Sequence, residues 1–248
     1  MENQRTTEWI ADVNKEYHER QFDQPYRSTV AFCDWLQKLG CLNETDELRI
    51  LDLCAGQGAN VAYMGTRFPD SSFIGVDFNA DIVERGNVAL RRRGMDNCQL
   101  ECGDLYDLKR EHVAAFDGIV SYQTLSWLPE CEEPIRVMAS LDAPWIALTS
   151  LFFDGPVSCT TQIREYDENL KTARESFYNV YSLPVVQALF RANGYTQVQW
   201  NRFEIDVDLP KPNHCKMGTY TETLEDGRRL QVSGPLLMPW FFLLARKG

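Results

Sequence analysis

Residues 48–64, with the sequence LRILDLCAGQGANVAYM, constrain the fold of this chain of 248 residues more than any other stretch. An apolar run interrupted by Asp52 precedes a small-residue turn with Gly56 and Gly58, and apolar residues then recur at helical spacing. This order is typical of a buried parallel strand, a glycine turn and a helix. Because glycine has no side chain, backbone amides in such a turn can approach a ligand closely. In open α/β sheets, nucleotide-like cofactors bind there, at the carboxyl end of the first strand.

The spacing of the glycines bears on which nucleotide the turn would bind. A dinucleotide fingerprint reads G-x-G-x-x-G/A, and its third small residue would fall where Val61 stands. The segment instead resembles motif I of class I S-adenosylmethionine-dependent methyltransferases, an acid followed by a small-residue loop of the G-x-G type. The match is carried by Asp52, Ala55, Gly56 and Gly58. Cys54 departs from it, because the family usually has its first glycine there. An ordinary strand-to-helix turn is the alternative for the glycine pair alone.

A second short strand is predicted at 72–76, and Asp77 follows it, 25 residues beyond Asp52. A carboxylate at this place offers two acceptor oxygens to the two hydroxyls of a ribose. The segment that begins with Asp77, DFNADIVERG, resembles the post-I motif of the same family, and the resemblance adds Phe78 to the cofactor site. Asp81 fits better as the N-cap of the next helix.

A third strand is predicted at 98–102, and Gly103, Asp104 and Leu105 follow it. In the family that the chain resembles, an acid at this place accepts a hydrogen bond from the adenine amino group, and the next backbone amide donates to the ring. The resemblance therefore implies that Asp104 and Leu105 bind the adenine. A turn aspartate without a ligand is the alternative.

The fourth predicted strand, 116–122, ends where the sulfur of the cofactor and a substrate would meet. The residues that follow it resemble motif IV of small-molecule methyltransferases. They lack the N/D-P-P-Y signature of enzymes that methylate adenine bases or glutamine amides, which counts against those substrates. Tyr122 and Gln123, together with His18 near the N-terminus, are the candidate catalytic residues. A general base is needed only if the acceptor must lose a proton to become nucleophilic.

Two helices are predicted before the first strand, at 6–21 and 27–39, and in the family such helices form a cap over the cofactor edge of the sheet. The segment 25–29, PYRST, lies between them and is rich in hydrogen-bond donors. Tyr26 and Arg27 are candidates for the methionine carboxylate of the cofactor, because a planar guanidinium binds a carboxylate bidentately. Packing on the flank of the sheet is the alternative role for the cap.

The resemblance implies that S-adenosylmethionine is the cofactor. The residues that it assigns to binding are Tyr26, Arg27, Asp52, Cys54, Ala55, Gly56, Gly58, Asp77, Phe78, Asp104, Leu105 and Tyr122.

After a fifth predicted strand at 145–153 the pattern loosens. Residues 154–181 show no clear sheet element, and their aromatic side chains either line an acceptor pocket or form a stripe on a surface helix. The aromatic residues in question are Tyr166, Phe177, Tyr178 and Tyr181. A sixth strand is predicted at 198–207. A β-hairpin follows at 219–232, with Asp226-Gly227 as a type I′ turn, and the last strand is predicted at 238–245.

These elements predict an α/β fold, a Rossmann-like class I methyltransferase sheet of seven strands with an N-terminal helical cap and a C-terminal β-hairpin insertion. The resemblance implies that the last strand is antiparallel. We expect one domain over 1–248, with a cap at 1–45, a cofactor-binding core at 46–153, and the substrate-side insertion and C-terminal strands at 154–248.

The composition bears on partners and compartment. The 25 basic and 36 acidic residues give a formal charge of −11, which argues against duplex nucleic acid or an anionic membrane as a partner. No apolar run approaches the length of a membrane span and the start of the chain is polar, so a cytoplasmic protein is expected. Eight cysteines without a C-x-x-C pair, and only three histidines, favour free thiols and no metal site. The oligomeric state stays open.

The expected reaction is an in-line methyl transfer from a sulfonium to a small-molecule acceptor, in which positioning and desolvation supply much of the rate. The acidic balance favours an amine acceptor. One alternative is a regulatory protein that binds S-adenosylmethionine without catalysis. The other is an NAD-dependent oxidoreductase, against which Val61 counts.

Overall fold

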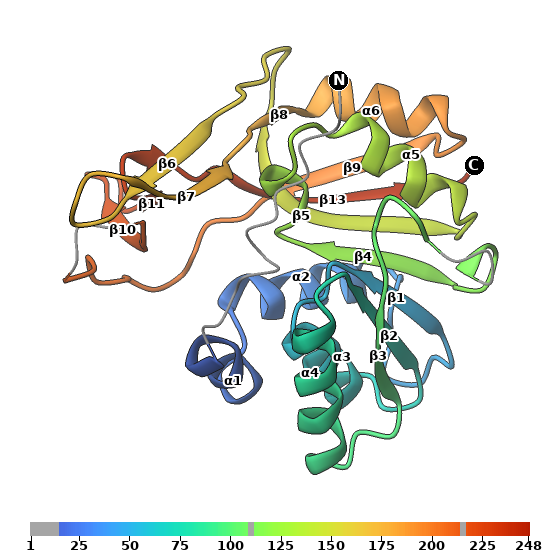
Figure 1. Ribbon diagram of the computed structural model, residues 1–248. Coiled ribbons are helices and arrows are strands. Elements are labelled where there is room, and N and C mark those ends of the chain that lie inside the picture. Colours follow the sequence, from blue (N-terminus) through green and yellow to red (C-terminus); the bar gives the residue numbers. More distant parts are fainter. Residues whose placement is uncertain (1–14, 109–111, 214–216) are drawn as a thin grey trace.

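The computed structural model describes residues 15–108, 112–213 and 217–248. Its main sheet contains β1 (Arg49–Leu53), β2 (Ser72–Asp77), β3 (Cys98–Cys102), β4 (Gly118–Tyr122), β5 (Trp145–Phe153), β9 (Gln197–Arg202) and β13 (Trp240–Arg246). These strands lie in the order β3-β2-β1-β4-β5-β13-β9 (Figure 1). The first five pair in parallel, and β13 runs antiparallel to both β5 and β9. The seven predicted strands and the antiparallel last strand are confirmed, and the short β8 (Tyr181–Ser182), which pairs with β5, adds an eighth strand to the sheet.

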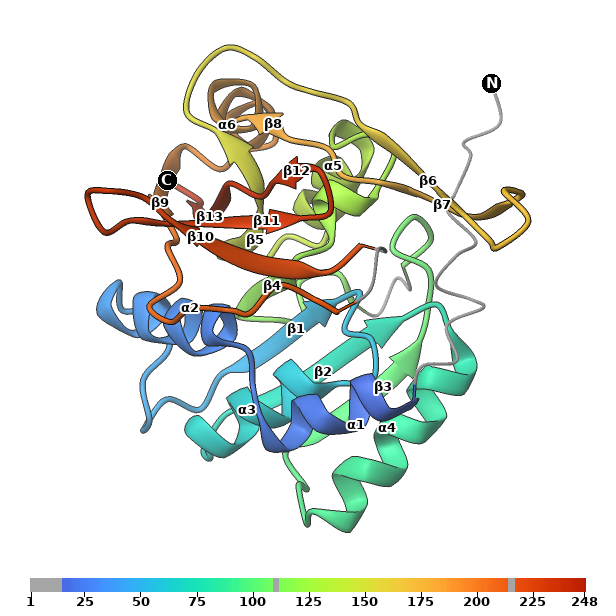
Figure 2. The same ribbon diagram turned by 90° about the vertical axis from the view of Figure 1, so that its left-hand side faces the viewer.

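Helices cover both faces of this sheet (Figures 1 and 2). They are α1 (Lys15–Asp23), α2 (Arg27–Lys38), α3 (Ala59–Arg67), α4 (Ala80–Arg92), η3 (Leu125–Trp127), α5 (Glu132–Ser140) and α6 (Leu183–Ala192). Ile50 of β1 packs with Phe32 of α2 in one apolar cluster, whereas its neighbour Leu51 packs with Ile135 of α5 in another. Because successive strand residues point to opposite faces, β1 is buried on both sides, as its apolar run predicts.

The N-cap of the helix that follows β2 lies two residues earlier than the sequence predicts. The side chain of Asn79 accepts a hydrogen bond from the Ile82 backbone amide at 3.2 Å and is the N-cap of α4. Asp81 lies within the first turn, so its prediction as the cap is wrong. Asparagine and aspartate cap almost equally well, and their spacing alone does not decide between them.

Residues 154–181 contain strands, where the sequence predicts either no sheet element or a surface helix. β6 (Gln162–Tyr166) and β7 (Thr172–Phe177) form an antiparallel hairpin, and β8 (Tyr181–Ser182) pairs with the end of β5. Ion pairs join the hairpin strands, Arg164 with Glu175 at 2.6 Å and Arg174 with Glu165 at 3.6 Å. Opposite charges across a ladder support strand pairing. Since most of the hairpin side chains are exposed, the sequence carries no apolar alternation that would reveal it.

The predicted C-terminal hairpin is confirmed as β10 (Thr219–Thr223) and β11 (Arg229–Ser233), with β12 (Leu236–Leu237) as a short third strand. Its turn differs from the prediction. A type I′ turn needs positive φ at both central residues, and of Asp226 and Gly227 only the glycine has it, at 83°. The bonds from Gly227 N to Leu224 O and from Leu224 N to Arg228 O fit a type I turn with a glycine bulge instead.

Both hairpins emerge at the edge of the sheet where β5 ends, because β13 begins opposite Leu151 and runs back along β5. In Figure 2 they face the viewer together with the cap helices α1 and α2. Helix α2 matches its predicted range closely, whereas the helix predicted at 6–21 lies partly outside the described residues. Within the described part of the chain, none of the helices has the length and hydrophobicity of a membrane span.

Candidate functional site

A cavity of about 250 Å³ lies at the carboxyl ends of the first four strands. The loops after β1, β2, β3 and β4 line it with residues 54–57, 77–78, 103–106 and 122–124, and the cap adds side chains from α1 and α2. Four features that the sequence analysis singles out therefore lie at one cavity: the glycine loop, Asp77, the Asp104 turn and the end of the fourth strand.

The loop after β1 contains three residues with left-handed backbone. Gly56, with φ of 57°, lines the cavity, and a Cβ built on it meets no atom within 4 Å, so a side chain there would enter open space. Gly58, with φ of 84°, packs against Leu100, which a Cβ would approach to 2.9 Å. Gly56 thus leaves room for a ligand, whereas Gly58 leaves room for the core. Cys54 adopts φ of 61°, at a steric cost that glycine would avoid.

Asp77 ties the loop to the end of β2. One carboxylate oxygen accepts a hydrogen bond from the Gly56 backbone amide at 2.8 Å, and the other accepts one from the Asn79 amide at 3.0 Å. Each carboxylate oxygen has more than one acceptor site, so these bonds leave capacity for hydroxyl donors from a ligand. Asp77 both shapes the loop and presents an acceptor to the cavity that it lines.

Asp52 lies beneath the loop and does not line the cavity. The residue is 1% exposed, and among the described residues neither carboxylate oxygen has a hydrogen-bond partner. Burial, and secondarily the charge of Asp77, raise the pKa of Asp52 well above its usual value. This environment favours the protonated form of Asp52. The sequence predicts instead that Asp52 contacts the cofactor directly.

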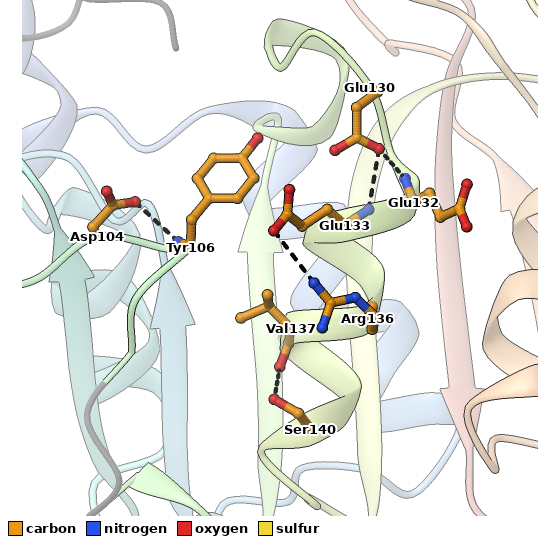
Figure 3. A network of polar contacts seen from close by, with 8 residues as sticks. All are labelled: Asp104, Tyr106, Glu130, Glu132, Glu133, Arg136, Val137 and Ser140. Carbon is orange, nitrogen blue, oxygen red and sulfur yellow. Dashed lines mark hydrogen bonds and ion pairs between the residues drawn. The ribbon is translucent and has the colours of Figure 1, made fainter. Parts of the chain in front are cut away.

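The adenine-side candidates follow β3. Asp104 accepts a hydrogen bond from the Tyr106 backbone amide at 2.9 Å, and Figure 3 shows this pair across from the start of α5. Asp104, Leu105 and Tyr106 all line the cavity. On the right of Figure 3, Glu130 accepts hydrogen bonds from the backbone amides of Glu132 and Glu133 in the first turn of α5.

Tyr122 and Gln123 line the cavity at the end of β4 in different ways. The Tyr122 hydroxyl lies 3.5 Å from Cys33 Sγ and 3.3 Å from Met64 Sδ, within the core, and burial raises its pKa well above the usual value. Gln123 has left-handed backbone, with φ of 55°. Its side-chain Nε2 donates to Ser28 Oγ on α2 at 3.1 Å.

The cap residues that the sequence singles out have separate places. Tyr26 lines the cavity and accepts a hydrogen bond from Gln21 Nε2 at 3.1 Å. Arg27 does not line it and forms an ion pair with Asp206 at 3.0 Å. His18 belongs to α1, but its side chain lies outside the described part of the structure.

Several residues of the cavity wall were missed in the sequence. Thr29 of α2 donates to Asn60 Oδ1 of α3 at 2.8 Å, and both line the cavity. A signal was available for Asn60, a polar residue in an otherwise apolar first helical turn directly after the glycine loop. Trp127 of η3 is a further wall residue, and it belongs to the segment after the fourth strand that the sequence places at this site.

The aromatic residues predicted to line an acceptor pocket do not line this cavity. Tyr166 is 51% exposed on β6. Tyr178 lies behind the wall, with its ring edge-to-face against Trp127 at 3.9 Å between centroids. Among the described residues, the loop after β4 lines this cavity, whereas residues 154–181 do not.

Comparison with known proteins agrees with this geometry. Residues 50–143 match a protein family described as a methyltransferase domain. The chain is 30% identical over 111 residues to malonyl-(acyl-carrier protein) O-methyltransferase of Bacillus cereus, a match that covers 44% of this chain and 39% of that protein. It is 28% identical over 82 residues to trans-aconitate 2-methyltransferase of Deinococcus radiodurans, covering 33% of this chain and 29% of that one. The chain thus spans less than half the length of these curated relatives.

Solved structures share the fold. The YcgJ protein from Bacillus subtilis superposes with a TM-score of 0.56 at 14% identity, over 88% of this chain and 99% of that one. The N-terminal domain of EvdMO1, solved with S-adenosylhomocysteine (SAH) bound, gives 0.55 at 13% identity, over 89% and 81%. With the strand order, these findings show that the chain has the class I methyltransferase fold, and residues 50–143 match the methyltransferase-domain family.

Proposed function

We propose that this chain is an enzyme that transfers a methyl group from S-adenosylmethionine to a small-molecule acceptor. One observation carries the proposal: the loops after β1, β2, β3 and β4 present the glycine turn, two acids and Gln123 to a single cavity. Because the strands lie in the order β3-β2-β1-β4, the Asp104 turn, Asp77, the glycine turn and Gln123 follow one another along the same edge of the sheet.

In this proposal the cavity residues bind the parts of the cofactor in turn. Asp77 accepts hydrogen bonds from the ribose hydroxyls, and Asp104 and Leu105 bind the adenine. Gly56 leaves room for the chain between ribose and sulfur. For the amino-acid end we propose Asn60 and Tyr26 rather than Arg27, because both line the cavity, whereas Arg27 is paired with Asp206.

When bound, S-adenosylmethionine supplies a methyl group on a sulfonium, which is already a strong electrophile. The chain then has to orient the acceptor and exclude water, tasks that fall to the walls at Tyr26, Tyr122 and Trp127. Because the Tyr122 hydroxyl is directed into the core and an amide such as Gln123 is no base, we assign neither of them to proton removal. An acceptor that is nucleophilic without a base, such as a neutral amine, fits this wall.

The names of two relatives favour a carboxylate acceptor rather than an amine. These relatives are named for methylation of malonyl-(acyl-carrier protein) and of trans-aconitate, both of which are carboxylic acids. The charged side chains among the described residues of the cavity wall are Asp77 and Asp104. Negative charge favours a cationic or neutral acceptor over a carboxylate, so we propose an amine and keep a carboxylate as the second candidate.

The test is SAH binding and methyl transfer by matched variants. Asp77→Asn should weaken SAH binding by about 1.5–3 kcal/mol, the range for a hydrogen bond to a charged group. Asp81→Asn, which changes an acid of the same segment outside the cavity, should bind as the wild type does. Transfer of tritiated methyl groups to N-methylaniline, an amine without a carboxylate, compared with transfer to trans-aconitate, then separates the two acceptor classes. Tight SAH binding without transfer to any acceptor would favour a regulatory protein.

A further inference from the structure

Two neighbouring hydroxyl residues of the cap hold two amide side chains on the cavity wall. Thr29 Oγ1 donates to Asn60 Oδ1 at 2.8 Å, and Ser28 Oγ accepts from Gln123 Nε2 at 3.1 Å. Asn60 belongs to α3 and Gln123 follows β4, so α2 reaches two different elements through consecutive residues. Both amides line the same cavity.

These two bonds give the amides opposite polarity toward a ligand. An amide side chain has one acceptor oxygen and one donor nitrogen. Asn60 commits its oxygen to Thr29 and therefore presents Nδ2, a donor, to the cavity. Gln123 commits its nitrogen to Ser28 and therefore presents Oε1, an acceptor.

Gln123 is held in this place at a cost to its backbone. Its φ of 55° is in the left-handed region, which is sterically unfavourable for a residue other than glycine. The backbone amide is fixed by hydrogen bonds to Thr149 O at 2.9 Å and to Thr149 Oγ1 at 3.0 Å on β5. Strained residues of this kind persist where the surroundings determine them and concentrate at functional sites.

We infer that Gln123 Oε1 accepts a hydrogen bond from the methyl acceptor, and that Ser28 is a positioning residue that turns this oxygen toward it. The inference rests on the proposed function and deepens it. The acceptor carries an N–H on the nitrogen that is methylated, and Gln123 orients that nitrogen through this hydrogen. The nitrogen lone pair forms the new bond to the methyl carbon, the bond from that carbon to sulfur breaks with its electron pair on sulfur, and the ammonium product then loses its proton to solvent. Carboxylates, which have no such hydrogen when ionised, are disfavoured.

The test compares two probes that differ only in whether their nitrogen carries a hydrogen or a second methyl group. N-methylaniline has an N–H, N,N-dimethylaniline has none, and both are uncharged in mildly alkaline buffer. Their dissociation constants are measured on the full chain saturated with SAH, by calorimetry or by saturation-transfer NMR. One neutral hydrogen bond corresponds to about a 3- to 10-fold preference, so Gln123→Met, which keeps the length but removes the acceptor, should shift the ratio of the two constants by this factor.

Ser28 variants separate positioning from packing. Ser28→Ala should lower the preference for N-methylaniline, and Ser28→Thr, which keeps the hydroxyl, should restore it, with SAH affinity unchanged in both. If Gln123→Met does not fold, the two Ser28 variants carry the test, because Ser28 is only half-buried. A ratio that stays the same in Gln123→Met and Ser28→Ala overturns the inference, as does a wild-type chain that binds SAH but shows no preference between the probes. Failure of the wild-type chain to bind SAH overturns the proposed function itself.

Discussion

The proposed cofactor side and the proposed acceptor side of the cavity are built from contacts of different range. On the cofactor side, Asp77 bonds to the amides of Gly56 and Asn79, which lie 21 and 2 residues away along the chain. On the acceptor side, the bond between Gln123 and Ser28 spans 95 residues and joins the central sheet to the cap. Short-range contacts leave a motif in the sequence, whereas long-range contacts leave none. The chemistry common to a fold can thus be local, while the features particular to one chain lie in tertiary contacts.

The largest effect is expected from closing the cofactor side at Gly56. Gly56→Val places a β-branched side chain into open cavity and forces it into left-handed backbone, so SAH affinity should fall by at least about 100-fold. Gly94 offers a matched control, because it has φ of 66° and open space around its Cβ but does not line the cavity. Gly94→Val should cost stability and leave affinity intact. Similar SAH affinities for the two variants would show that Gly56 does not face the ligand.

A smaller effect is expected at the amino-acid end of the cofactor. Asn60→Ala should weaken SAH binding by about 1–2 kcal/mol, since a charged carboxylate loses a donor. Binding of 5′-methylthioadenosine, which lacks the amino-acid end, should change little. Arg27→Ala should affect neither ligand by more than about threefold, because exposed ion pairs such as the one with Asp206 contribute little. If Arg27→Ala weakens SAH but not 5′-methylthioadenosine, the cap residue named by the sequence holds the carboxylate after all.

The burial of Asp52 predicts a dependence of stability on pH. Because the pKa of Asp52 is raised in the folded chain, the folded state keeps a proton that the unfolded state loses above its ordinary value of 3.8. The free energy of unfolding therefore falls as pH rises from 3.8 toward the raised pKa. Asp52→Asn removes this contribution and should be more stable than the wild type at neutral pH, by about 1 kcal/mol or more.

Chemical denaturation over a pH series measures the difference between Asp52→Asn and the wild type. Asp208 serves as a control of opposite sign, because hydrogen bonding and ion pairing with Arg229 lower its pKa. The stability that Asp208 adds is lost as pH falls through its lowered pKa, so Asp208→Asn should be no more stable than the wild type at neutral pH. If the difference in the free energy of unfolding between Asp52→Asn and the wild type does not change with pH, Asp52 ionises normally in the folded chain.

The smallest effect is expected at Cys54. Cys54→Gly relieves the left-handed strain at φ of 61° and restores the residue more common in the family. Stability should change by only about 1 kcal/mol, in the direction of gain, offset by the greater freedom of glycine in the unfolded chain. SAH affinity should stay within about threefold, since a neutral thiol accepts and donates only weakly. A large loss of affinity would indicate that the thiol itself contacts the ligand.

The difference between short-range and long-range contacts also explains which features of the fold and the site the sequence predicts. The alternation of buried strands and helices predicts the main sheet, and glycines and acids at strand ends predict Gly56, Asp77 and Asp104 as neighbours in space. Local spacing could not show that the Tyr122 hydroxyl is directed into the core. Nor could it show that Arg27 pairs with Asp206, because that partner comes from beyond the sixth strand of the main sheet. The sequence does not predict the β6–β7 hairpin, because ion pairs rather than an apolar face join the side chains of its two strands.

The central claim is that the cavity at the carboxyl ends of β1 to β4 binds S-adenosylmethionine. Isothermal titration of the wild-type chain with SAH and, separately, with NADH tests it most directly. SAH should bind at one site per chain, NADH should give no heat, and Gly56→Val should lose the SAH signal. Binding of NADH without SAH, or SAH binding that Gly56→Val leaves unchanged, would contradict it.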